Sequence, residues 1–163
     1  MRFWDTSAIV PLLVDQPETD HASQLVRDDS DLVVWWSTPV ECASALSRLR
    51  REDVVDVAGE TRALSLLDLL MRAWTEVLPS EEVRLRARRL LRIHSLRTAD
   101  ALQLSAALLW AGSPAGHELV TYVERLALAA GLEVSRFFRI CHAKVRQGNC
   151  NYLEPSGKQC YIM

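Results

Sequence analysis

Short apolar segments alternate with longer segments of helical periodicity through the first 134 residues, and this alternation most constrains the fold. Strands that alternate with helices are typical of a parallel sheet with right-handed crossover connections. We therefore predict an α/β fold in which helices flank a parallel sheet of four to five strands. The expected strands are 2–4, 32–36, 74–78, 118–122 and 132–134; the expected helices are 8–13, 18–28, 57–72, 99–111 and 123–130, with two more that begin at Thr38 and Ser80.

The chain of 163 residues has room for one compact domain with a substantial core. We place this domain at 1–134. Residues 135–163 form an atypical tail, because apolar periodicity fades there while both lysines and three of the four cysteines gather in it. A mobile or disordered extension, an expression artefact and a shifted reading frame all stay open as explanations. The sequence carries no apolar run of about 18 residues and no signal peptide, which makes the cytoplasm the expected location.

Three acidic residues stand at or near the starts of predicted helices. Asp5 directly follows the first strand, Glu41 comes shortly after the second, and Asp100 lies in the first turn of an otherwise apolar helix. Each could act only as a helix cap. Together they favour a ligand site, because parallel sheets bind ligands beyond the carboxyl ends of their strands. Converging carboxylates repel one another unless a cation neutralises them, and hard oxygen ligands favour Mg²⁺ or Mn²⁺.

The net charge of -2 shows no overall basic excess, but the cations are unevenly placed. Only two of the 19 are lysines, and six arginines fall between Arg84 and Arg97. A guanidinium group binds phosphate in a two-pronged fashion, so Arg88, Arg92 and Arg97 could follow a nucleic-acid backbone. A solvated helix face explains the same arginines equally well.

Three motifs, taken in order, resemble those of the PIN-domain ribonucleases, and in particular the VapC-like toxins of type II toxin–antitoxin modules. They are Phe3-Trp4-Asp5-Thr6-Ser7-Ala8, Thr38-Pro39-Val40-Glu41 and Leu96-Arg97-Thr98-Ala99-Asp100-Ala101-Leu102-Gln103-Leu104. The resemblance covers residues 1 to about 134. It implies a three-layer sandwich that cleaves RNA with Mg²⁺ or Mn²⁺, assembles as a homodimer and is silenced by a cognate antitoxin. It also implies that Asp5, Glu41 and Asp100 are catalytic metal ligands, with Thr6 or Ser7 near the site.

One position departs from the family pattern. After the fourth strand the family commonly has Thr-x-Asp-x-x-Leu, whereas this chain has Thr121, then Val123 in place of the acid, and Leu126. Valine cannot bind a metal. Glu124 is adjacent, but one residue turns a helix by about 100 degrees, and Thr121 is available to hold a water. The alternative hypothesis is therefore a catalytically impaired PIN-like module that binds RNA or an antitoxin; a third is a structural domain whose acids are caps.

Other candidate residues favour structural roles. His94 lies on the apolar side of its helix, and Cys42 stands in an apolar helix without an evident cation nearby. The aromatic side chains of Trp35 and Trp36 could stack on bases, but their strand is expected to be core. Cys141, Cys150 and Cys160 are spaced unlike a zinc site, and we predict free thiols.

Overall fold

The computed structural model describes residues 1–112, 117–133, 138–142, 151–153 and 159–161. Along these segments it contains seven helices and seven strands, which confirms the predicted alternation over the first 133 residues. The strands are β1 (Arg2–Trp4), β2 (Leu32–Trp35), β3 (Thr75–Val77), β4 (His117–Val120), β5 (Phe138–His142), β6 (Asn151–Leu153) and β7 (Gln159–Tyr161). The helices are α1 (Thr6–Leu13), α2 (Thr19–Asp28), α3 (Thr38–Arg51), α4 (Val57–Leu70), α5 (Glu81–Ile93), α6 (Thr98–Ala111) and α7 (Glu124–Glu133).

All described strands join one sheet in the order β3-β2-β1-β4-β5-β6-β7. The pairings from β3 through β5 are parallel, as predicted, and β6 and β7 continue the sheet antiparallel. The order runs from β1 outward to β3 on one side and through β4 to β5 on the other. The direction of winding therefore reverses between β1 and β4, which is where open α/β sheets place their ligands.

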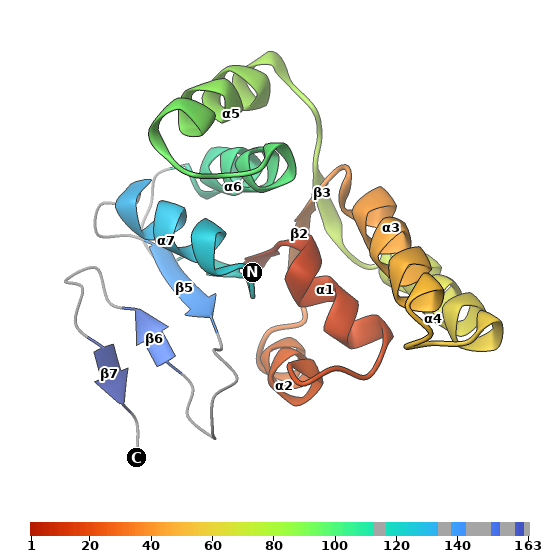
Figure 1. Cartoon of the computed structure of the whole chain (residues 1–163). Helices are drawn as coiled ribbons and strands as arrows, with labels where there is room; N and C mark the ends of the chain where they lie inside the picture. The colour runs from red at the N-terminus through yellow and green to blue at the C-terminus, as the bar shows by residue number, and fades with distance from the viewer. Residues whose placement is uncertain (113–116, 134–137, 143–150, 154–158, 162–163) are drawn as a thin grey trace.

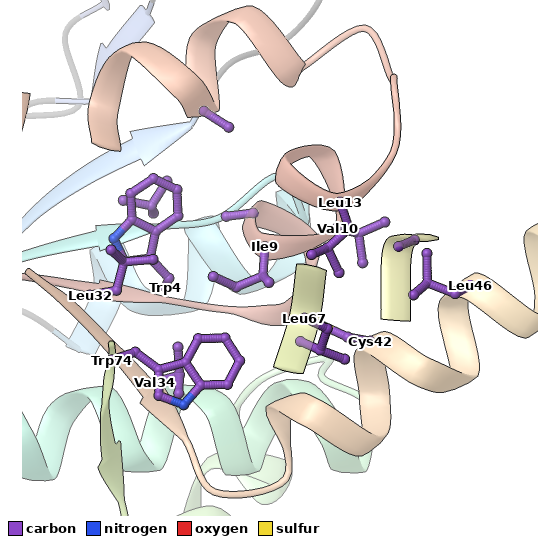
Figure 2. Packing of buried hydrophobic residues seen from close by; sticks show 14 of the residues in the cluster. Trp4, Ile9, Val10, Leu13, Leu32, Val34, Cys42, Leu46, Leu67 and Trp74 are labelled. Carbon is purple, nitrogen blue, oxygen red and sulfur yellow. The ribbon is translucent and has the colours of Figure 1, made fainter. Parts of the chain in front are cut away.

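Helices cover both faces of the sheet, which makes the molecule a three-layer sandwich (Figure 1). Successive residues of a strand point to opposite faces, so Phe3 packs under α5, α6 and α7, while Trp4 packs under α1 to α4. Figure 2 shows the second of these two cores, in which Trp4, Ile9 and Val34 belong to one cluster of buried side chains. The sheet lies between the two cores, and the pairing of its strands fixes where each strand ends relative to its neighbours.

Two local expectations were wrong. Residues 132–133 belong to helix α7 and not to a strand, because Gly131 does not stop the helix; glycine inside a helix costs only about 1 kcal/mol relative to alanine. Trp36 lies outside β2 and is 52% exposed, whereas Trp35 is buried in the core as expected.

The predicted turn at residues 112–116 falls largely outside the described residues, except for Gly112, which follows α6 with a φ of 51°. The strands β5, β6 and β7 lie in the range predicted as an atypical tail, and the division of the chain at residue 134 stays a prediction. Cys150 is outside the described residues, as are the side chains of Cys141 and Cys160.

None of the helices in the described segments has the length and apolar character needed to cross a membrane.

Candidate functional site

The first acid lies at the point where the winding of the sheet reverses. Asp5 follows β1 directly, and its backbone N–H donates a hydrogen bond to the carbonyl oxygen of Val120, the last residue of β4 (3.1 Å). Thr121 therefore sits beside Asp5, although 116 residues separate them in the sequence. The paired strands β1 and β4 fix this arrangement, because their register sets both strand ends at the same edge.

Asp5 is only 4% exposed, and its carboxylate accepts a hydrogen bond from the Ser7 hydroxyl (2.7 Å). Burial raises the pKa of Asp5 to about 6, an effect that hydrogen bonds from Ser7 and Thr121 partly offset and that the charge of Glu41 reinforces. Ser7 in turn accepts a hydrogen bond from the backbone N–H of Tyr122 (2.8 Å). The acid is thus held in place by the segments that follow both β1 and β4.

Glu41 lies in the first turn of α3, and three side chains donate hydrogen bonds to its carboxylate. These are the hydroxyls of Ser37 (2.6 Å) and Thr6 (2.7 Å) and the amide of Gln103 (3.1 Å). A capping box with Thr38 was one explanation of this glutamate, and it is wrong because α3 begins at Thr38 with Ser37 as its N-cap. Glu41 therefore binds side chains of two other helices, Thr6 of α1 and Gln103 of α6, in addition to Ser37 at the start of its own helix, and a cap alone would not do this.

Asp100 lies in the first turn of α6 and is 7% exposed. It does accept a capping hydrogen bond from the backbone N–H of Arg97 (2.9 Å), so the cap explanation holds in part. Its two oxygens also receive both prongs of the Arg125 guanidinium, at 2.5 Å and 3.0 Å. Arg125 comes from the first turn of α7, and Asp100 raises its pKa by this hydrogen bonding.

Gln103 is a site residue that the sequence reasoning missed. It is 1% exposed, and its Nε2 lies within hydrogen-bond distance of Thr6 (3.0 Å), Thr38 (3.2 Å) and Glu41. Its Oε1 is buried and accepts no hydrogen bond within the described part of the chain. The available signal was a polar residue one turn after Asp100, at i+3 on an apolar helix, where it shares a face with the acid.

The three acids line one open pocket of about 660 Å³. Among the supporting residues predicted from the sequence, Thr6 and Ser7 also line it, whereas Thr121 is fully buried and is not part of the lining. Val123 lines the pocket, whereas Glu124 is not among its lining residues, and the supporting role of Glu124 stays a prediction.

The three arginines predicted to bind RNA are exposed, Arg88 and Arg92 on α5 and Arg97 just before α6, and none of them is among the lining residues of the pocket. Their part in RNA binding stays a prediction. Arg48 and Arg51 of α3 line the pocket instead. Residues seven apart on a helix share a face, so the spacing from Glu41 to Arg48 was a signal that could have identified Arg48.

The oxygen atoms around the pocket are of the types that bind a hard cation, because Mg²⁺ and Mn²⁺ prefer carboxylate, hydroxyl and amide oxygens as ligands. The buried, unpaired Oε1 of Gln103 adds a further oxygen of this type. In the part of the chain that the structure describes, however, no three His, Cys, Asp or Glu side chains lie close enough together to hold a metal ion. Asp100 in this arrangement is bound to Arg125.

Two remaining candidates are not among the residues that line the pocket. His94 is the C-cap residue that follows α5, and its Nε2 lies 2.8 Å from a carboxylate oxygen of Glu133. Cys42, on the buried face of α3, is fully buried in the core, and burial raises the pKa of its thiol to about 12.

Comparison with known proteins agrees with this fold. The model of the PIN domain family matches residues 2–132. The fold is similar to that of a protein from a toxin–antitoxin complex of Klebsiella pneumoniae (TM-score 0.54, 16% identity, covering 76% of this chain and 87% of that one). It is also similar to FitAcB from Neisseria gonorrhoeae (TM-score 0.58, 16% identity, covering 84% of this chain and 96% of that one). A third similar structure is FitAB bound to an IR36 DNA fragment (TM-score 0.55, 18% identity, covering 85% of this chain and 94% of that one). None of the curated proteins matches the sequence.

Proposed function

This chain belongs to the PIN domain family, and from that membership we propose that it is a metal-dependent endoribonuclease that hydrolyses RNA phosphodiester bonds. The observation that carries the proposal is the convergence of three acids from separate segments on one pocket. Asp5 comes from the end of β1, Glu41 from α3 and Asp100 from α6, and arginines of α3 stand beside them. Caps alone would have no reason to face a common pocket.

In this proposal Asp5, Glu41 and Asp100 hold Mg²⁺ or Mn²⁺. When bound, such an ion supplies a water of lowered pKa and a positive charge for the phosphoryl oxygens. The chain's own groups hold the acids in position: Ser7 and Thr121 donate to Asp5, and Gln103 donates to Glu41.

Phosphate binding is the role we propose for Arg48 and Arg51. Both are exposed, both line the pocket, and a guanidinium group binds phosphate oxygens through two parallel N–H groups. An RNA backbone that enters along α3 would then pass the acids at the end of β1.

We further propose that the protein is the toxin of a toxin–antitoxin pair, acts in the cytoplasm, forms a homodimer and is silenced by a cognate antitoxin. The support is the similarity of its fold to that of a protein from a toxin–antitoxin complex. Exposed apolar side chains on α3 and α4, including Val40, Val57 and Leu69, offer surface that a protein partner could cover.

The test is cleavage of a labelled single-stranded RNA with and without Mn²⁺, next to a DNA of the same sequence. We expect cleavage of the RNA that needs Mn²⁺ and that Asp5→Asn and Asp100→Asn each abolish. Glu81→Gln, an exposed change on α5 away from the pocket, is the matched control and should leave cleavage intact. Activity that survives both aspartate changes would exclude the metal role.

A catalytically impaired module that binds RNA or an antitoxin is the second candidate. It is favoured by Val123, which lines the pocket where the family commonly has an acid. If the native chain is inactive and Val123→Asp creates Mn²⁺-dependent cleavage, this second candidate is correct. Cleavage by the native chain decides for the enzyme.

A further inference from the structure

Arg125 already supplies a positive charge to the acidic pocket. Its guanidinium binds both oxygens of Asp100, through Nε at 2.5 Å and through the second prong at 3.0 Å. The Asp100 side chain is 9% exposed and the Arg125 side chain 39% exposed. The Asp100 carboxylate is therefore buried, whereas the Arg125 side chain that binds it is partly exposed to solvent.

This pair differs from an ordinary surface ion pair. A two-pronged bond to a buried carboxylate is among the stronger charge-assisted contacts, whereas exposed pairs contribute little. With the capping hydrogen bond from Arg97, the Oδ2 of Asp100 already receives two donors and Oδ1 receives one. An ion that enters the pocket thus finds this carboxylate turned toward a competing cation.

The place of Arg125 in the sequence connects this ion pair with the missing acid at position 123. Arg125 lies in the first turn of α7, two residues after Val123, which lines the pocket and directly precedes this helix. Where an acid at position 123 would have added negative charge, this chain has a neutral side chain and a cation that reaches across to α6. The charge of Arg125 also acts on Asp5, since Asp5 contributes to raising the pKa of the arginine.

We propose that Arg125 is an internal counter-ion that competes with the divalent metal for Asp100, so that metal binding requires the guanidinium to leave. This inference rests on the proposed function, because it concerns the same metal site. The arginine is exposed enough to swing toward solvent, and Asp100 then becomes available beside Asp5 and Glu41.

Calorimetric titration of the full chain with Mn²⁺ tests the proposal without reference to activity. We expect Arg125→Ala to bind Mn²⁺ about tenfold more tightly than the native chain, since no bond to Asp100 has to be broken. The same variant should unfold at a lower temperature in the absence of metal, because a buried carboxylate has lost its partner. Its melting temperature should then rise more on addition of Mn²⁺ than that of the native chain.

Arg89→Ala is the matched control, because Arg89 also makes a two-pronged bond to a carboxylate, that of Glu133, away from the pocket. We expect Mn²⁺ affinity in this variant to equal that of the native chain. Arg125→Lys is the second variant in case the alanine change prevents folding. It keeps the charge without the fork, and its affinity should fall between those of the native chain and Arg125→Ala.

Equal or weaker Mn²⁺ affinity in the Arg125 variants would overturn the proposal while leaving the metal site itself in place. Absence of Mn²⁺ binding in every protein, native chain included, would overturn both this proposal and the metal role of the three acids.

Discussion

Asp5 combines deep burial with a negative charge, and this makes the stability of the metal-free protein depend on pH. Its pKa is about 6 in the folded chain, above its ordinary value of 3.8. Between these two values the folded state binds more protons than the unfolded state, so stability falls as the pH rises from 3.8 to 6. Above pH 6 the cost of the buried charge is fully present.

Asp5→Asn should therefore stabilise the metal-free protein at neutral pH. We expect its free energy of unfolding in urea and EDTA to exceed that of the native chain at pH 7.5, and the excess to shrink by roughly 2 kcal/mol at pH 4.5. Asp29→Asn is a control of opposite sign, because the N-terminal amine lowers the pKa of Asp29. An advantage of Asp5→Asn that does not change with pH would contradict the expectation.

Gln103 sets the position of Glu41 through a single amide. Gln103→Met keeps the volume but removes the donor shared by Glu41, Thr6 and Thr38. Loss of a partner that orients a metal ligand typically lowers metal affinity or activity by about 10- to 100-fold, and we expect a loss of that size in Mn²⁺-dependent RNA cleavage. Gln24→Met, an exposed glutamine change on α2, should have no effect.

An unchanged cleavage rate in Gln103→Met, with the fold verified by circular dichroism, would exclude the positioning role.

The sequence predicted the acids of this pocket better than it predicted their partners. Asp5, Glu41 and Asp100 each follow a local signal, namely the end of a strand or the start of a helix. The bond between Arg125 and Asp100 has no such signal, because it depends on how α7 packs beside α6. The contact between Gln103 and Glu41 likewise joins residues 62 positions apart across the layers.

Among the elements, α3 carries the most consequential surface, because Glu41 and two pocket arginines lie on it. We expect Arg48→Ala and Arg51→Ala each to weaken binding of single-stranded RNA about three- to tenfold in EDTA, and to reduce the salt dependence by about 0.7 per arginine. Fluorescence anisotropy over a range of salt concentrations measures both. The matched controls are Arg88→Ala and Arg92→Ala on α5.

If the α5 changes weaken RNA binding and the α3 changes do not, the RNA instead binds along the arginines between Arg84 and Arg97 that the sequence indicated.

Elements with strong local signals were predicted closely, and those that depend on packing were not. Ser80 caps α5 as expected, and its hydroxyl accepts a hydrogen bond from the backbone of Val83 (3.2 Å). In α7, by contrast, Gly131 does not end the helix as predicted. Burial of Leu126, Ala127 and Ala130 in the core stabilises this helix. Packing of a helix face provides more free energy than one glycine costs.

At the scale of the whole molecule, one sheet separates two cores. Leu46 of α3 lies in one core and Leu90 of α5 in the other, and both are fully buried. We expect Leu46→Ala and Leu90→Ala each to lower the free energy of unfolding by about 2 to 5 kcal/mol. Because the sheet belongs to both cores, each variant should still unfold in one transition by near- and far-ultraviolet circular dichroism.

The double variant should lose about the sum of the two single losses, since the side chains lie on opposite faces of the sheet. Two separate transitions in either single variant would mean that the layers fold independently.

The arrangement of the layers also bears on what a bound ion would do to the protein as a body. Asp5 and Glu41 belong to the layer of α1 and α3, whereas Asp100 belongs to the layer of α6. An ion held by all three would cross-link the two outer layers at the end of the sheet. Its binding would therefore slow amide hydrogen exchange in helices on both sides of the molecule at once, well beyond the residues it touches.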